Sequence, residues 1–147
     1  MMTREIHELT RKECLELLTQ SPVGRLGFID SVGIFPIIVP VDYVMHHSSA
    51  VFRTDPGAKL AAAIRGAGVA FEVDHTDDVE RTGWSVLLRG TAEEVVDADG
   101  VGELEQLHLQ PRAPGARQHY VRLEVNLLSG RRIDLDKAAG PWWDPTP

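Results

Sequence analysis

Arg53, Thr54 and Lys59 are the residues whose types and spacing could bind an anion. They flank a predicted change from strand to helix, because Ala50–Thr54 is rich in β-branched and aromatic residues and Asp55-Pro56 suits the N-cap and first position of a helix. The free N–H groups of such a helix, a hydroxyl and two cations together favour a phosphate. The alternative is an ordinary strand-to-helix turn, since Asp55 adds negative charge and no glycine-rich loop surrounds the segment.

Composition limits the possible partners. The chain has 147 residues, of which 25% are charged, and this fits a single globular domain. A net charge of −7 would repel nucleic acid and anionic membranes, so an anionic ligand needs a local group of cations. No apolar stretch resembles a signal peptide or a membrane span, which predicts a cytoplasmic protein. The single cysteine, Cys14, is expected to be a buried structural thiol.

The pattern predicts many short strands and few helices. Thr10 and Glu13 have capping-box spacing and should open a helix that ends near Thr19. Two further helices are expected at 56–65, ended by Gly66, and at 99–109. Strands are expected at 23–29, 34–45, 50–54, 69–73 and 84–96, with a last strand or hairpin at 119–133 and loops at 74–82 and 110–118. Because most connections are short, the strands should be antiparallel and form a small β-barrel.

Prolines and a glycine mark irregular points in these strands. Pro36 and Pro40 cannot donate to a strand ladder, so this part of the second strand should lie at an edge, bulge, or pass beside a ligand. Gly90 lies in the middle of the longest strand and indicates a bulge or a sharp bend.

Four segments resemble the flavin-nucleotide-binding split barrels related to pyridoxamine 5′-phosphate oxidase. These segments are the first helix with Val23–Phe28, the proline-containing strand Ile37–Tyr43, the strand and helix start Phe52–Lys59, and the long strand Trp84–Gly90. The resemblance implies a mainly β fold, a six-stranded antiparallel split β-barrel with two or three short helices. It also implies a homodimer with FMN in a groove at the dimer interface. The barrel domain would comprise residues 1–137 and a tail residues 138–147.

The same resemblance assigns cofactor-binding roles by position. Arg53, Thr54 and Lys59 match the phosphate clamp, and Ser85 matches a polar contact to the ligand. The strand along the isoalloxazine ring would comprise Ile38, Val39, Pro40 and Val41. No catalytic acid or base is indicated, because the flavin carries the hydride chemistry in such enzymes.

The implied function is an FMN-dependent oxidoreductase that passes hydride or electrons to a small-molecule acceptor. The alternative is a non-enzymatic protein that binds or carries a flavin, haem or a deazaflavin coenzyme on the same fold, and FAD could replace FMN. A third possibility is a dimeric interaction module with an empty groove. Vitamin-B6 oxidation itself is not indicated, because Ser129–Asp134 matches the arginine-rich substrate motif only loosely.

Two remaining features of the sequence are the aromatic tail and the histidines. Trp142 and Trp143 should anchor the tail, either on the barrel or partner subunit or by stacking on the flavin, and Trp142 is included among the cofactor-binding residues. The histidines, including the pair His46-His47, lack the spacing of a zinc motif, so no metal site is expected.

Overall fold

The computed structural model describes residues 5–30, 32–54, 64, 66–107, 109 and 119–134. Its strands are β1 (Glu5–Glu8), β2 (Val23–Ile29), β3 (Pro36–His46), β4 (Ser49–Thr54), β5 (Gly68–Asp77), β6 (Thr82–Val95), β7 (His119–Leu123) and β8 (Leu127–Asp134). The helices with defined bounds in the described residues are α1 (Arg11–Gln20) and α3 (Ala98–Glu105). Neither described helix is long and apolar enough to cross a membrane.

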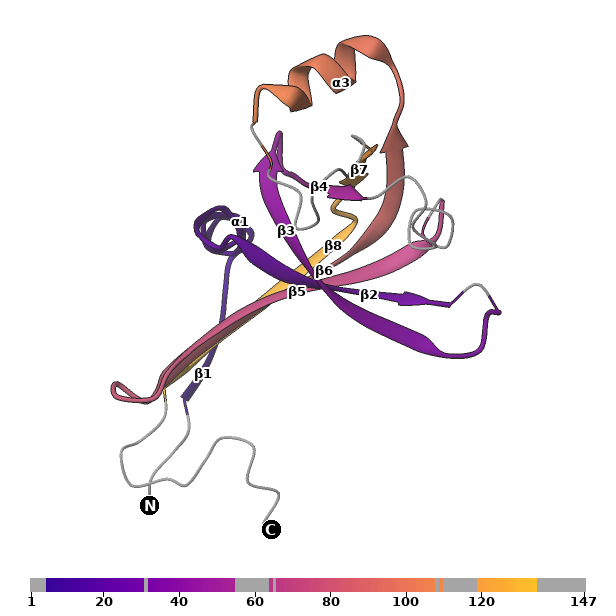
Figure 1. Cartoon of the computed structure of the whole chain (residues 1–147). Coiled ribbons are helices and arrows are strands. Elements are labelled where there is room, and N and C mark those ends of the chain that lie inside the picture. The colour runs from indigo at the N-terminus through magenta and orange to yellow at the C-terminus, as the bar shows by residue number, and fades with distance from the viewer. Residues whose placement is uncertain are drawn as a thin grey trace.

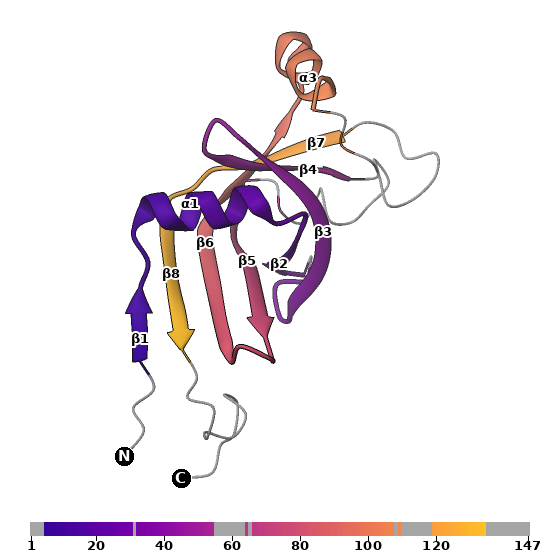
Figure 2. The ribbon, with the colours of Figure 1, turned by 90° about the vertical axis from the view of Figure 1, so that its left-hand side faces the viewer.

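Six of the strands form a closed antiparallel barrel in the order β6, β5, β2, β3, β4 and β7, which pairs again with β6. The barrel divides along one edge of β6. Residues 82–89 of this edge pair with β8, whereas residues 92–95 pair with β7. β1 extends the sheet beyond β8, and Figure 2 shows β1, β8, β6 and β5 side by side below β4 and β7. The expected mainly β six-stranded barrel is confirmed.

Gly90 lies where β6 changes partner. A Cβ atom at this position would overlap the backbone carbonyl of Glu124, so only glycine lets the chain cross so closely. The crossing is fixed on either side of Gly90 by bonds from Glu124 N–H to the Thr91 carbonyl and from Asn126 N–H to the Arg89 carbonyl. The expected irregularity at Gly90 is therefore the junction between the two halves of the barrel.

The core fills the barrel and continues under α1. Inward-facing side chains that are fully buried include Leu26, Phe52, Phe71, Leu88 and Leu123. The alternation of buried and exposed residues along β2 and β6 is that of strands with one face toward a core. Figure 1 shows α3 above the other end of the barrel, where the buried Leu104 joins a second cluster with Val51, Val95, Leu109 and Tyr120.

The first helix begins as the sequence predicts. Thr10 accepts a hydrogen bond from the N–H of Glu13, whose carboxylate accepts one from the N–H of Thr10, and this completes the capping box. The helix buries Cys14 and Leu18 against the barrel, which confirms the buried thiol. Burial also raises the pKa of the Cys14 thiol.

The helix expected at 56–65 lies outside the described residues except for Ile64, which is helical and buried. Gly66 has the left-handed φ of +66° that suits a glycine at the end of a helix. The third expected helix, at 99–109, is observed as α3 and ends earlier, at Glu105.

Two expectations about the strands are wrong, and one strand was missed. Residues 74–77 continue β5 instead of forming a loop, because β6 pairs with them through Asp77. β1 was not anticipated, since its polar residues gain their order from the neighbouring strand β8. β7 and β8 do not form a hairpin with each other, because both pair along the same edge of β6.

Candidate functional site

The two strands expected to hold the ligand diverge. β3 and β4 pair only from Tyr43 with Phe52 to His46 with Ser49. Beyond that point, Pro36–Asp42 continues along β2, while Arg53-Thr54 continues along β7. Among the described residues, the other edge of Pro36–Asp42 has no strand partner. The prolines were expected to mark an edge, a bulge or a neighbouring ligand, and among the described residues the pairing of this segment with β2 alone agrees with an edge.

The four candidate residues on this strand face in two directions. Ile38 is 72% exposed and Pro40 is also exposed, whereas Val41 is only 8% exposed and belongs to the core. Val39 packs partly against the same core. A ligand beside this strand could therefore contact the side chains of Ile38 and Pro40, but only the backbone edge of Val39 and Val41.

Arg53 is half-buried on the side of β4 that faces α3. Its Nη1 donates a hydrogen bond of 2.6 Å to the carbonyl of Leu109, and its guanidinium carbon lies 5.6 Å from the centre of the Tyr120 ring. Its Nε is buried and has no hydrogen-bond partner among the described residues. Arg53 thus has one donor bonded within the fold and one buried donor that meets no acceptor in the described part of the chain.

The other candidate residues do not all meet at this point. Thr54 ends β4 and pairs with His119 of β7, next to Arg53. Ser85 lies on β6 opposite Asp74 of β5, so β5 and β2 separate it from β3. Lys59 and Trp142 lie outside the described residues. Within one chain, the structure brings Arg53 and Thr54 beside the divergence and leaves Ser85 away from it.

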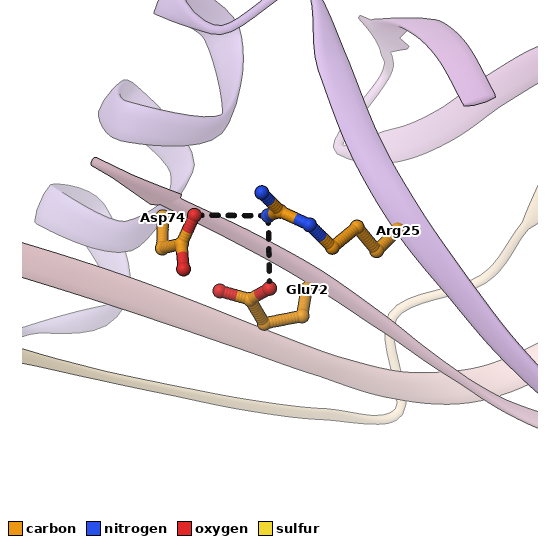
Figure 3. Close-up of polar contacts among 3 residues, drawn as sticks. All are labelled: Arg25, Glu72 and Asp74. Atoms are coloured by element: carbon orange, nitrogen blue, oxygen red, sulfur yellow. Dashed lines mark hydrogen bonds and ion pairs between the residues drawn. The ribbon is translucent and has the colours of Figure 1, made fainter. Parts of the chain in front are cut away.

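A cation that sequence reasoning missed lies on the outer face of β2. Arg25 stands between Pro40 on β3 and Glu72 on β5 in the strand register. Figure 3 shows its guanidinium between two carboxylates, with Nη1 2.9 Å from Asp74 Oδ1 and 3.3 Å from Glu72 Oε2. Burial and the nearby Asp74 raise the pKa of Glu72, whereas the bond to Asp74 raises that of Arg25. Because two acids already neutralise Arg25, it is a poor candidate for binding a phosphate.

The tip of the β2–β3 hairpin exposes an unusual amount of apolar surface. Its exposed residues, which we call the apolar tip, are Ile29, Val32, Ile34, Phe35, Ile37 and Ile38. Figure 1 shows this hairpin extending away from the rest of the barrel. Several large apolar side chains exposed close together in this way are typical of an interaction site. The run Ile34-Phe35 directly after the turn at Gly33 was the available sequence signal.

The surface hollows lie elsewhere. One of about 490 Å³ runs along the outer side of α1 and is lined by Leu15, Glu16 and Thr19, among others. Another of about 370 Å³ lies between α1 and the strands at His7 and Arg132. Neither includes Arg53 or the open edge of β3. Both hollows are lined by residues of α1, the second together with residues of β1 and β8.

Comparison with known proteins agrees with this architecture. The family described as pyridoxamine 5′-phosphate oxidase matches residues 10–132. The chain is 36% identical over 138 residues to the uncharacterised protein Rv0080 of Mycobacterium tuberculosis, and the match covers 90% of this chain and 89% of the relative.

Two solved structures resemble the whole barrel. An FAD-binding protein from Mycobacterium smegmatis is 32% identical, with a TM-score of 0.75 and coverage of 87% of this chain and 98% of that one. A putative pyridoxamine 5′-phosphate oxidase from Corynebacterium glutamicum is 29% identical, with a TM-score of 0.77 and coverage of 92% and 99%. The fold is that of a split-barrel protein. The chain belongs to the pyridoxamine 5′-phosphate oxidase family.

Proposed function

We propose that this protein binds a flavin nucleotide along the open edge of β3, with the phosphate end beside Arg53 and Thr54. The observation that carries the proposal is the divergence of β3 and β4, which leaves Pro36–Asp42 without a second strand partner among the described residues. A flat heterocycle could occupy this edge, contacting the exposed Ile38 and Pro40 and the backbone of Val39 and Val41. The FAD bound by the mycobacterial protein of similar structure supports a flavin as the ligand class.

The chemistry of Arg53 fits an anionic group. A buried donor without an acceptor costs about 1–3 kcal/mol, and an oxygen of the ligand reaching Arg53 Nε would remove that cost. Lys59 would add a second cation, since it follows Thr54 closely in the sequence. These cations would hold the phosphate locally in a chain whose net charge is −7.

The groove would be completed by a second copy of the chain. The apolar tip adjoins the open edge of β3 and is exposed in the isolated chain, and burying it across a two-fold axis would stabilise a homodimer. A dimer would also account for Ser85, which two strands separate from β3 in its own chain and which could reach the ligand from the partner.

The proposed activity is that of an oxidoreductase. A bound flavin would supply the hydride or electron transfer to a small acceptor. The edge of β3 would fix the orientation of the flavin ring. The apolar tip, which includes Ile38, would exclude water from the ring. FMN is the flavin we expect, with FAD and a deazaflavin coenzyme as the alternatives. Arg131 and Arg132 lie exposed on β8, beside Ser85 and Trp84 in register, and do not form a recognisable site for a vitamin-B6 phosphate.

The phosphate clamp is tested by comparing FMN with riboflavin, which lacks the phosphate. Lys59→Ala should weaken FMN binding by about 2–5 kcal/mol if the pair is desolvated, and should leave riboflavin binding unchanged. Fluorescence titration of the wild-type and variant proteins measures both affinities. Equal affinity for the two flavins, unaffected by the substitution, would contradict the clamp.

A carrier without turnover is the second candidate. It is favoured by the apolar character of the outward-facing residues at the edge, Ile38 and Pro40, which offer no acid or base. The visible spectrum of freshly purified protein separates the cofactors, because a Soret band would indicate haem and flavin absorption would support the proposal. Reoxidation of the reduced flavin by a panel of small acceptors, faster than reoxidation of free flavin, would favour the enzyme over the carrier.

A further inference from the structure

The hairpin turn between β3 and β4 brings two adjacent histidines to the same side of the chain. His46 ends β3, and His47 and Ser48 form the turn with left-handed φ angles of 48° and 63°. Adjacent residues of a regular strand point to opposite faces. In this turn, however, the rings of His46 and His47 lie with their centres 4.0 Å apart. The turn therefore brings together two imidazoles that a regular strand would point to opposite faces.

A carboxylate from α3 completes the cluster. Glu103 Oε1 lies 3.0 Å from Nε2 of His46 and 3.0 Å from Nε2 of His47. The next residue, Leu104, is fully buried and fixes the rotation of α3 on the barrel, so that Glu103 meets the hairpin. These two segments are far apart in sequence, which is why motif spacing gave no sign of the cluster.

We propose that His46, His47 and Glu103 form a site for a divalent transition metal such as Zn²⁺. The three ligand atoms lie within 4.8 Å of one another, and two imidazoles with one carboxylate are a common donor set for this class of ion. Metal bonds of about 2.0–2.1 Å in tetrahedral geometry place ligand atoms roughly 3.3 Å apart, close to the two histidine–glutamate distances. Small rotations of the side chains would admit the ion.

The exposure of the three residues defines the kind of site. The side chain of His46 is 12% exposed, whereas those of His47 and Glu103 are 77% and 53% exposed. Solvent can therefore reach the ion from one side, and water would complete its coordination as in zinc sites with three protein ligands. An exposed glutamate is a carboxylate at neutral pH and can therefore act as a ligand.

The ion would join two parts of the fold. It would bind both the β3–β4 hairpin and α3, whose Leu104 packs in the same buried cluster as Val51 of β4. A ligand that binds only the folded protein raises its apparent stability. The proposed site therefore predicts a melting temperature that rises with the concentration of added Zn²⁺.

The test uses the full chain without an affinity tag, first treated with chelator. Calorimetric titration with Zn²⁺ at neutral pH should show one ion bound per chain. His47→Asn should weaken binding about tenfold or more, because losing even an outer partner of a metal ligand has an effect of this size. Asparagine tolerates the left-handed turn, which keeps the hairpin intact. Glu103→Gln should have a similar effect without changing the shape of the side chain.

His75→Asn is the matched control, since His75 is an exposed histidine outside the cluster. It should leave the affinity and the Zn²⁺-dependent rise in melting temperature unchanged. Titration with Co²⁺ gives an independent readout, because its visible bands report coordination by nitrogen and oxygen. No saturable binding up to about 100 µM Zn²⁺, a concentration that corresponds to only about −5.5 kcal/mol of binding, would overturn the proposal. Binding that His47→Asn and Glu103→Gln leave unchanged would overturn it too.

Discussion

Two glycines of β2 show how single atoms shape this barrel. A Cβ atom at Gly24 would overlap the ring of Phe71, which is fully buried and lies edge-on to Tyr43 at 4.8 Å between ring centres. Gly24→Ala should therefore destabilise the protein by about 1–3 kcal/mol, as overpacked cores do. Denaturant unfolding followed by circular dichroism measures the change.

Gly27→Ala is the control on the same strand. Its Cβ would meet only ordinary contacts at 3.7 and 3.8 Å, with the backbone and side chain of Ala70. The substitution should be close to neutral, or stabilise by a few tenths of a kcal/mol through the unfolded chain. If both variants lost the same stability, the effect would belong to β2 as a whole and not to the contact between Gly24 and the ring of Phe71.

Tyr43 predicts a dependence of stability on alkaline pH. Burial raises its pKa from 10.0 to about 12, and its hydroxyl donates a hydrogen bond of 2.6 Å to the carbonyl of Leu18. Above pH 10 the unfolded chain loses this proton first, so the stability that Tyr43 contributes is complete below pH 10 and declines as the pH rises toward 12.

Tyr43→Phe isolates this effect from other groups that titrate in the same range. The free energy of unfolding of the wild type should exceed that of the variant by about 1 kcal/mol at neutral pH, the usual value of a hydrogen bond. The difference should narrow between pH 10 and pH 12. A difference that stays constant over this range would mean that the phenol titrates equally in both states.

At the scale of elements, the junction at Gly90 holds the two halves of the barrel. Gly90→Ala would force the backbone of Glu124 away, and with it the hydrogen bonds that Glu124 and Asn126 donate to β6. Because backbone atoms cannot move aside as the end of a side chain can, we expect Gly90→Ala to lower the free energy of unfolding by more than about 3 kcal/mol. Gly83 lies on the same strand, and a Cβ atom there would have its nearest contacts at 3.4 Å. Gly83→Ala should therefore change the free energy of unfolding by no more than about 0.5 kcal/mol. Melting curves of both variants test the difference.

Some elements could be predicted from the sequence and others could not. The capping box at Thr10 and the turn at Gly66 were readable because their signals are local. The extension of β5 through Asp77 was not, since its polar residues are ordered by pairing with β6 and not by a buried face. The cluster of His46, His47 and Glu103 could not be predicted either, because the carboxylate comes from a helix that is distant in the sequence.

The candidate site was readable only in part. The prolines of β3 indicated an edge, a bulge or a neighbouring ligand, because a proline lacks its N–H whatever the fold around it. The sequence could not show that Val41 faces the core or that Arg53 bonds to Leu109, because both depend on how the barrel closes. Position in the sequence likewise could not show that two strands, β5 and β2, separate Ser85 from β3.

For the whole molecule, we propose that the ligand site and the dimer interface depend on each other. The open edge of β3, the apolar tip and Ser85 make one groove only if a second copy supplies the missing side. Flavin binding and dimerisation should therefore be linked, and substitutions that disrupt the dimer should also lower the affinity for the flavin. Ile34→Glu on the exposed hairpin would place like charges across the proposed interface without touching the core.

Size-exclusion chromatography with light scattering and flavin absorbance measures both properties in one experiment. After incubation with FMN and removal of excess ligand, we expect flavin absorption in a peak of about twice 16.2 kDa, with about one flavin per chain. A monomeric peak of 16.2 kDa that retains its flavin tightly would contradict the shared groove. A dimer that binds no flavin of any form would contradict the proposed function.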